Sequence, residues 1–196
     1  LHYPVYDRQG AIVTTSFTNL DLHDISRVAK TYDCKIFFLV TPVRPQREFA
    51  SKLIRHWTDG FGSNYNPSRK EALQLLSIQS DLEETLDVIY KLEAEEKPII
   101  IATGAKGTLA NLDFPGCRRM IRMSNEKRPF LFLFGTGWGL SCEVMQRADY
   151  VLEPIRGRGI YNHLSVRSAV AIILDRLLGD YGATFGNPEE SNNECN

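Results

Sequence analysis

Short runs of hydrophobic residues alternate along the chain with stretches in which apolar residues recur every three or four positions. The first pattern is typical of strands buried on both faces, and the second of amphipathic helices. The sequence therefore predicts strands at residues 11–17, 35–41, 72–78, 98–103, 129–134 and 149–153. It predicts helices near residues 21–32, 45–58, 81–96, 108–123, 141–147 and 163–178.

Strands that alternate with helices are typical of an α/β fold, in which a mostly parallel sheet carries helices on both faces. Ser80 and Glu83 have the spacing of a capping box ahead of the helix at 81–96. The segment Asp59 to Pro67 is rich in Gly and Asn, and we expect it to be the longest loop. One domain is expected over residues 1–179, followed by a polar, acidic and flexible tail at 180–196.

Composition narrows the class of protein. The chain has 23 basic and 24 acidic residues, but residues 180–196 hold acids and no bases, so the rest is slightly basic. Its cysteines form no C-x-x-C pair, which argues against a zinc site or a disulfide framework and for free thiols in a cytoplasmic protein. No apolar stretch approaches 18 residues, so no membrane partner is expected. Because the first residue is Leu1 rather than Met, we expect the native chain to begin upstream.

Loops that contain glycine follow three successive predicted strands, at residues 103–107, 135–139 and 154–162. Neighbouring parallel strands would place these loops side by side at one edge of the sheet, where α/β proteins bind ligands. Glycine lets the backbone approach a flat polar ligand such as adenine. Any one of these loops is explained equally well as an ordinary tight turn. Three in succession favour a binding site.

A dinucleotide-binding loop is one alternative explanation of the segment that follows strand 129–134. Its spacing is G-x-G-x-G rather than G-x-G-x-x-G, although Glu153 lies close to where an acid would hold a ribose. The loop lies late in the chain, and bulky Trp138 stands where the backbone should approach a pyrophosphate. A nicotinamide-dependent oxidoreductase is therefore the weaker hypothesis.

The same segments resemble the SPOUT (SpoU–TrmD) class of α/β-knot RNA methyltransferases. Residues 98–107, 134–140 and 150–173 resemble the three cofactor loops of that class. The phrases HYPVYDRQG, TNLDLHDISR and GTGWGL extend the resemblance to small stand-alone domains sometimes fused to tRNA guanine-N1 methyltransferases. The resemblance implies a deep C-terminal trefoil knot, bound S-adenosylmethionine, an RNA substrate (tRNA or rRNA) and a homodimer formed through the knot.

The resemblance also implies which residues contact the cofactor, and it implies no metal. They are Ala102, Thr103, Gly104, Phe134, Gly135, Thr136, Gly137, Trp138, Gly139, Leu140, Glu153, Pro154, Ile155, Gly157, Tyr161, Asn162, His163, Leu164, Ser165 and Ser168.

Catalysis in the SpoU branch uses an N-terminal Asn and an Arg six residues on. Here Arg27 is the candidate catalytic residue, but Asp21 stands at the Asn position, and Ser165 replaces another frequent Asn. These departures leave open a second hypothesis, a catalytically silent module that binds the cofactor and assists a tRNA-modifying partner. The alternative for Arg27 is a surface arginine paired with Asp21 or Asp24.

Four arginines are candidates for binding RNA, because a guanidinium fork suits phosphate. Arg156 and Arg158 flank the third loop, whereas Arg44 and Arg47 belong to a basic stripe at helical spacing that also contains Lys52 and Arg55. A solvated helix face is the default explanation of that stripe.

Overall fold

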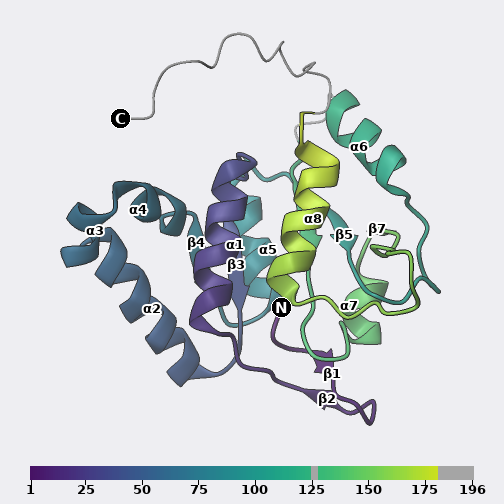
Figure 1. Ribbon diagram of the computed structural model, residues 1–196, viewed down its shortest axis with the longest axis horizontal. Coiled ribbons are helices and arrows are strands. Elements are labelled where there is room, and N and C mark those ends of the chain that lie inside the picture. Colours follow the sequence, from purple (N-terminus) through teal and green to yellow (C-terminus); the bar gives the residue numbers. More distant parts are fainter. Residues whose placement is uncertain (125–127, 181–196) are drawn as a thin grey trace.

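The computed structural model describes residues 1–124 and 128–180, and it shows an α/β arrangement of parallel strands between helices (Figure 1). In chain order the elements are β1 (Val5–Tyr6), β2 (Ile12–Val13), α1 (Asn19–Thr31), β3 (Phe37–Val40), α2 (Arg44–Thr58), α3 (Phe61–Tyr65), α4 (Pro67–Leu73), β4 (Leu76–Gln79), α5 (Leu82–Leu92), β5 (Ile99–Ala102), α6 (Phe114–Met123), β6 (Phe130–Leu133), α7 (Cys142–Gln146), β7 (Tyr150–Val151) and α8 (Val166–Leu178).

The main strands form two parallel sheets. In one, β3 pairs with β4, with Phe37 opposite Leu76. In the other, the order is β6-β5-β7, so that Ile99 lies opposite Phe130 and Ile101 opposite Tyr150. β1 and β2 form a separate antiparallel pair. The expected parallel topology is therefore confirmed, but the ladder between β3 and β6 is interrupted.

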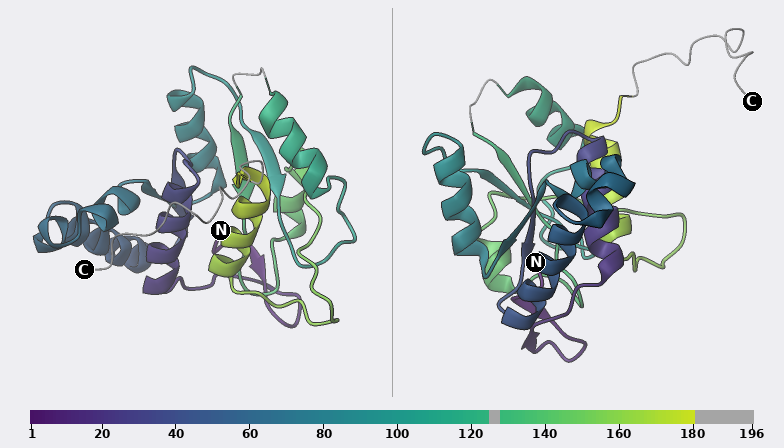
Figure 2. Two further views of the ribbon diagram at one scale, coloured as in Figure 1. Left: turned by 45° about the horizontal axis from the view of Figure 1, so that its top comes forward. Right: turned by 90° about the vertical axis from the view of Figure 1, so that its left-hand side faces the viewer.

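β5 shows why helices cover both faces of the sheet. Successive residues of a strand point to opposite faces. Ile100 and Ala102 pack with residues of α5 and α7, whereas Ile99 and Ile101 pack with residues of α6 and α8. In the right-hand view of Figure 2, α5 and α8 lie on opposite sides of the strands. A strand sandwiched in this way must be apolar throughout, as the sequence IIIA is.

The expected loop at Asp59 to Pro67 is wrong, because that segment is mostly helical. α3 occupies Phe61–Tyr65, and α4 begins directly at Pro67 with the Asn66 side chain accepting from the Arg69 amide over 2.9 Å. Proline suits the first position of a helix, since its missing N–H would have no partner there. α4 also displaces the expected start of the next strand, so β4 begins at Leu76.

Other boundaries were misplaced for local reasons. The predicted strand at 11–17 is reduced to Ile12–Val13, paired antiparallel with β1. The cap of α5 is Asp81 rather than Ser80, and the Ser80 N–H and hydroxyl instead donate to Glu84. The two late helices start at Phe114 and Val166, because Asp113 and Ser165 cap them.

The cysteines were expected to be free thiols, and the tail was expected to be flexible. Cys34, Cys117 and Cys142 are free thiols, while Cys195 and nearly all of the predicted tail lie outside the described residues. Burial raises the pKa of the Cys117 thiol to about 11. Among residues 1–124 and 128–180, the helices are all too short or too polar to cross a membrane.

Candidate functional site

The loops that follow β5, β6 and β7 meet at the carboxyl edge of the three-stranded sheet. The Thr103 hydroxyl, just after β5, donates to the Leu133 carbonyl at the end of β6 over 2.9 Å. The side-chain amide of Asn162 donates to the Ala105 carbonyl over 3.0 Å, which joins the first loop to the third. The structure therefore brings together three segments that are far apart in the sequence, as predicted.

The first loop returns to the sheet beside β7. The Asn111 amide donates to the Val151 carbonyl over 3.0 Å, and the Glu153 amide donates to the Leu112 carbonyl over 2.8 Å. The Glu153 carboxylate accepts from the Phe114 amide over 2.8 Å, at the start of α6. An anion at a helix N-terminus is stabilised by the unpaired amides there. Glu153 thus holds α6 in place, and a contact between Glu153 and the cofactor stays a prediction.

The glycine loop after β6 is held by the beginning of the chain. The Trp138 amide donates to the Tyr6 carbonyl over 2.9 Å, and the Tyr6 amide donates to the Gly139 carbonyl over 2.9 Å. Val5 and Leu140 add an antiparallel bridge. Residues 4–6 therefore act as a strap that fixes the backbone of the second loop.

The glycines of the site have two different roles. A Cβ on Gly137, where φ is +59°, would lie 2.8 Å from the Tyr6 carbonyl oxygen, and one on Gly135 would lie 2.9 Å from the Leu140 nitrogen. Both positions need glycine for packing. A Cβ on Gly104 or Gly157 would meet no atom within 4 Å. These two glycines leave open space beside the first and third loops, which fits a ligand that approaches the backbone closely.

The start of α8 carries the polar residues predicted from the third motif. Ser165 caps the helix, since its hydroxyl accepts from the Ser168 amide over 3.3 Å and lies 2.9 Å from the Ser168 hydroxyl. Tyr161, His163 and Leu164 precede the cap and are exposed. The rings of Tyr161 and His163 pack edge-on with centroids 5.3 Å apart. Trp138 on the second loop is also exposed.

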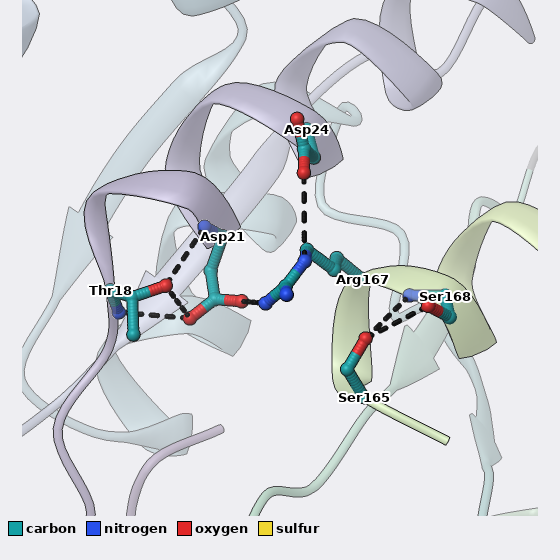
Figure 3. Close-up of polar contacts among 6 residues, drawn as sticks. All are labelled: Thr18, Asp21, Asp24, Ser165, Arg167 and Ser168. Atoms are coloured by element: carbon teal, nitrogen blue, oxygen red, sulfur yellow. Dashed lines mark hydrogen bonds and ion pairs between the residues drawn. The ribbon is translucent and has the colours of Figure 1, made fainter.

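Arg167 is a site residue that the sequence reasoning missed. Its guanidinium donates to Asp21 Oδ1 over 3.1 Å and lies 3.6 Å from Asp24 Oδ2, which ties α8 to α1 (Figure 3). The acids Asp21 and Asp24 indicate a basic partner, but the sequence offered only Arg27 for it, as the alternative to a catalytic role of that residue. Burial alone would raise the pKa of Asp21, yet hydrogen bonds from Thr18 and the charge of Arg167 hold that pKa below its usual value.

Arg27 lies on the exposed side of α1. Within residues 1–124 and 128–180 its guanidinium has no hydrogen bond or ion pair, so the pairing with Asp21 or Asp24 does not form there. The guanidinium is available to a substrate, and its catalytic role stays a prediction.

The four candidate RNA-binding arginines fall into two separate groups. Arg156 lies against the first loop, where a Cβ on Gly107 would be 3.3 Å from its guanidinium, and Arg158 is exposed beyond it. Arg44 pairs with Glu48 over 2.9 Å, and Arg47 donates to the Thr41 carbonyl over 2.9 Å. Figure 1 shows α2 on the far side of α1 and α8 from β7, so the two groups do not form one patch.

Potential metal ligands are dispersed in the described part of the chain. No group of three or more His, Cys, Asp or Glu side chains there is arranged to hold a metal ion. The groups exposed at the site are backbone, hydroxyl and amide groups and the guanidinium groups of Arg156 and Arg158.

Comparison with solved structures defines the fold. The fold matches a probable methyltransferase from Bordetella pertussis Tohama I at 17% identity and a TM-score of 0.58, over 80% of this chain and 86% of that chain. It also matches a SpoU methyltransferase from Streptomyces viridochromogenes, whose structure contains AdoMet, at 17% identity and a TM-score of 0.50, over 83% of this chain and 56% of that one. At this identity the matches show the fold alone, which is that of the SpoU methyltransferases.

Sequence comparison defines the family. Residues 1–179 match a family described as SAM-dependent RNA methyltransferase, and the chain belongs to that family. It is 44% identical over 180 residues to a tRNA (guanine-N(1)-)-methyltransferase of Oleidesulfovibrio alaskensis, covering 92% of this chain and 41% of that protein. It is 41% identical over 177 residues to an uncharacterized protein of Aquifex aeolicus, covering 90% of this chain and 85% of that protein. The chain thus spans about two fifths of the first relative's length.

Proposed function

We propose that this chain binds S-adenosylmethionine at the loops after β5, β6 and β7 and transfers its methyl group to RNA. The observation that carries the proposal is the meeting of these three loops in a chain of the SAM-dependent RNA methyltransferase family. The open space beside Gly104 and Gly157 supports it, because an adenine held by backbone groups must approach them closely.

The cofactor supplies a sulfonium methyl group, which accepts the electron pair of an RNA oxygen or nitrogen while the carbon–sulfur bond breaks. The chain's residues have to position the two reactants and help the nucleophile to lose its proton. Backbone groups of residues 102–104 and 134–140 are the candidates to hold the adenosine. Asn162, His163 and Ser165 are the candidates for its methionine end, because they lie where the third loop enters α8.

The finer assignment is a SPOUT enzyme with a C-terminal trefoil knot and a dimer formed through it. The packing of α8 against α1 and α6 supports a C-terminal segment that is enclosed by the rest of the fold, since Val170 and Leu174 pack with Ile25 and Ile173 packs with Cys117. Sedimentation analysis of the purified chain measures the oligomeric state.

The proposed substrate is tRNA. The relative from Oleidesulfovibrio alaskensis is named as a tRNA methyltransferase, and Arg156 and Arg158 provide a positive edge beside the third loop. Phosphate contacts from such residues give an affinity that falls as salt rises. Arg44 and Arg47 are proposed to bind a different segment of the RNA, because they lie apart from Arg156 and Arg158.

A catalytically silent module is the second candidate. Asp21, at the position where the SpoU branch carries Asn, is bound to Thr18 and Arg167 and so serves structure rather than substrate. Two measurements distinguish the candidates. Calorimetry with S-adenosylmethionine tests cofactor binding, and no heat at millimolar cofactor would disprove both. Transfer of labelled methyl to undermodified tRNA, lost in Arg27→Gln, supports the enzyme, whereas binding without transfer supports the module.

A further inference from the structure

A mostly apolar cavity of about 450 Å³ separates β3 from β6. All four residues of each strand line it, with Leu82 and Ile89 of α5 on one face and Val170 and Leu174 of α8 on the other. In the described part of the chain, β3 is paired only with β4, and β6 only with β5. The cavity is therefore a gap in an otherwise parallel sheet, between two strand edges that face each other.

The open edges present specific backbone groups to this gap. The Leu133 carbonyl of β6 accepts from β5, so Phe130, Phe132 and Phe134 direct their N–H and C=O groups to the other edge, since these groups alternate along a strand. Phe37 and Thr41 donate toward β4, so Phe38 and Val40 direct theirs into the gap. Buried backbone groups without partners are costly, and native folds almost always pair them.

Leu1 and His2 pair with the two edges in the manner of a strand. The Leu1 nitrogen donates to the Phe134 carbonyl over 2.6 Å, on the β6 side. The His2 amide donates to the Val40 carbonyl over 2.9 Å, on the β3 side. Successive amides that bond to opposite neighbours are the pattern of a strand inside a sheet. Both bonds lie at the carboxyl ends of β3 and β6.

The Leu1 nitrogen is an amine buried at the end of an apolar cavity. Burial lowers its pKa to about 5, because a charged ammonium is poorly solvated there. A peptide N–H in the same place would make the same hydrogen bond without a charge. This position therefore favours a continuing chain over a terminus.

We propose that residues immediately preceding Leu1 form a β-strand in this cavity, parallel to β3 and β6. The direction follows because the strand would end at Leu1, beside the carboxyl ends of its neighbours. The strand would join the two sheets in the order β4-β3-new strand-β6-β5-β7. It would be roughly four or five residues long to match its partners, and apolar on both faces, because helices cover both.

Other occupants fit the cavity less well. A small apolar ligand would fill the volume but leave the backbone groups of Phe38, Phe130 and Phe132 without partners. A strand from a second copy would have to enter between α5 and α8, which line the two faces of the cavity. A segment attached to Leu1 satisfies the edges and removes the buried charge. This proposal is independent of the catalytic one.

The test compares three proteins: the present chain, the chain extended before Leu1 by six Val and Ile residues, and the chain extended by six Gly and Ser residues. The apolar extension should raise Tm by roughly 5 °C or more relative to the Gly/Ser extension. Hydrogen exchange at the Phe38, Val40 and Phe132 amides should slow by at least tenfold, while the Phe37 amide, already bonded toward β4, should change little.

A hydrophobic fluorescent dye, 1-anilinonaphthalene-8-sulfonate, reports on the cavity in the same proteins. Its fluorescence should fall with the apolar extension only. Equal Tm and equal exchange in the two extended proteins would overturn the proposal. So would a present chain that sediments as a dimer, excludes the dye and already protects Phe38 and Val40, because a second copy would then fill the gap.

Discussion

Arg167 of α8 and Asp21 of α1 form an ion pair over 3.1 Å, with the Asp21 side chain only 11% exposed and that of Arg167 34% exposed. The same Asp21 accepts from the Thr18 backbone and hydroxyl over 2.8 and 2.7 Å. One carboxylate thus caps α1 and fixes α8, which carries the third motif on its first turn.

The first prediction concerns this pair. Arg167→Gln should lower the free energy of unfolding by about 1–2 kcal/mol, because it leaves a largely buried carboxylate without its counter-charge. It should also weaken S-adenosylmethionine binding, since α8 begins at the third loop. Chemical denaturation and calorimetry measure the two effects.

Arg44→Gln is the matched control, because Arg44 forms an exposed i, i+4 pair with Glu48 on α2. We expect that change to stay within about 0.5 kcal/mol. Equal losses of unfolding free energy from the two substitutions would mean that the ion pair between α1 and α8 stabilises the fold no more than an exposed pair does.

The second prediction concerns the strap on the glycine loop. Gly137→Ala should destabilise the protein by roughly 1–3 kcal/mol, because it adds a Cβ 2.8 Å from the Tyr6 carbonyl at a φ of +59°. Gly104→Ala should leave Tm unchanged, since its Cβ would meet no atom within 4 Å. Thermal unfolding of the two variants decides the matter, and a similar Tm in both would contradict the assigned roles.

The third prediction concerns the contact between the first and third loops. Asn162→Ala removes the hydrogen bond to the Ala105 carbonyl and should weaken S-adenosylmethionine binding roughly three- to tenfold, with little change in Tm. Ser63→Ala also removes one side-chain bond to a backbone carbonyl, that of Gly60, but away from the loops. Unchanged cofactor affinity in Asn162→Ala would show that the third loop keeps its place without this bond.

The fourth prediction concerns pH. Burial, and then the nearby terminal ammonium, lower the pKa of His2 to about 4 from 6.5, although Asp21 opposes them. The unfolded chain therefore takes up a proton between these values while the folded chain does not, so stability is lost as pH falls from 6.5 toward 4. The full loss is roughly 3 kcal/mol.

His2→Gln should flatten this part of the stability profile, and the comparison cancels the contribution of the Leu1 amine, which both proteins share. Denaturation at several pH values between 4 and 7 gives the two slopes. Parallel slopes would mean that His2 titrates alike in the folded and unfolded chains.

The hydrophobic pattern was sufficient to predict the central strands, because β3, β5 and β6 are apolar on both faces and lie within the predicted ranges. It failed at Asp59 to Pro67, where residues typical of turns form α3 and the cap of α4. Such residues favour turns and helix starts alike, and the packing of α3 and α4 against α2 decides between the two.

The meeting of the three loops was predictable from parallel topology, but the partners of individual side chains were not. The pairing of Asp21 or Asp24 with their helical neighbour Arg27 was the alternative explanation of that arginine, whereas both acids contact Arg167, more than 140 positions away. A helical spacing in the sequence gives only local candidates. The packing of α1 on α8 through Ile25, Val170 and Leu174 brings Arg167 to the two acids, and helical spacing does not reveal this partner.

The strap between residues 4–6 and the glycine loop sets an order of events during synthesis. The Cys142 amide donates to the Tyr6 hydroxyl across 136 positions of sequence. At ribosomal speeds of about 5–20 residues per second, Tyr6 waits on the order of ten seconds for its partner. Until then the second loop does not exist and β1 can pair only with β2, so the three loops of the proposed site are assembled only after most of the domain has been made.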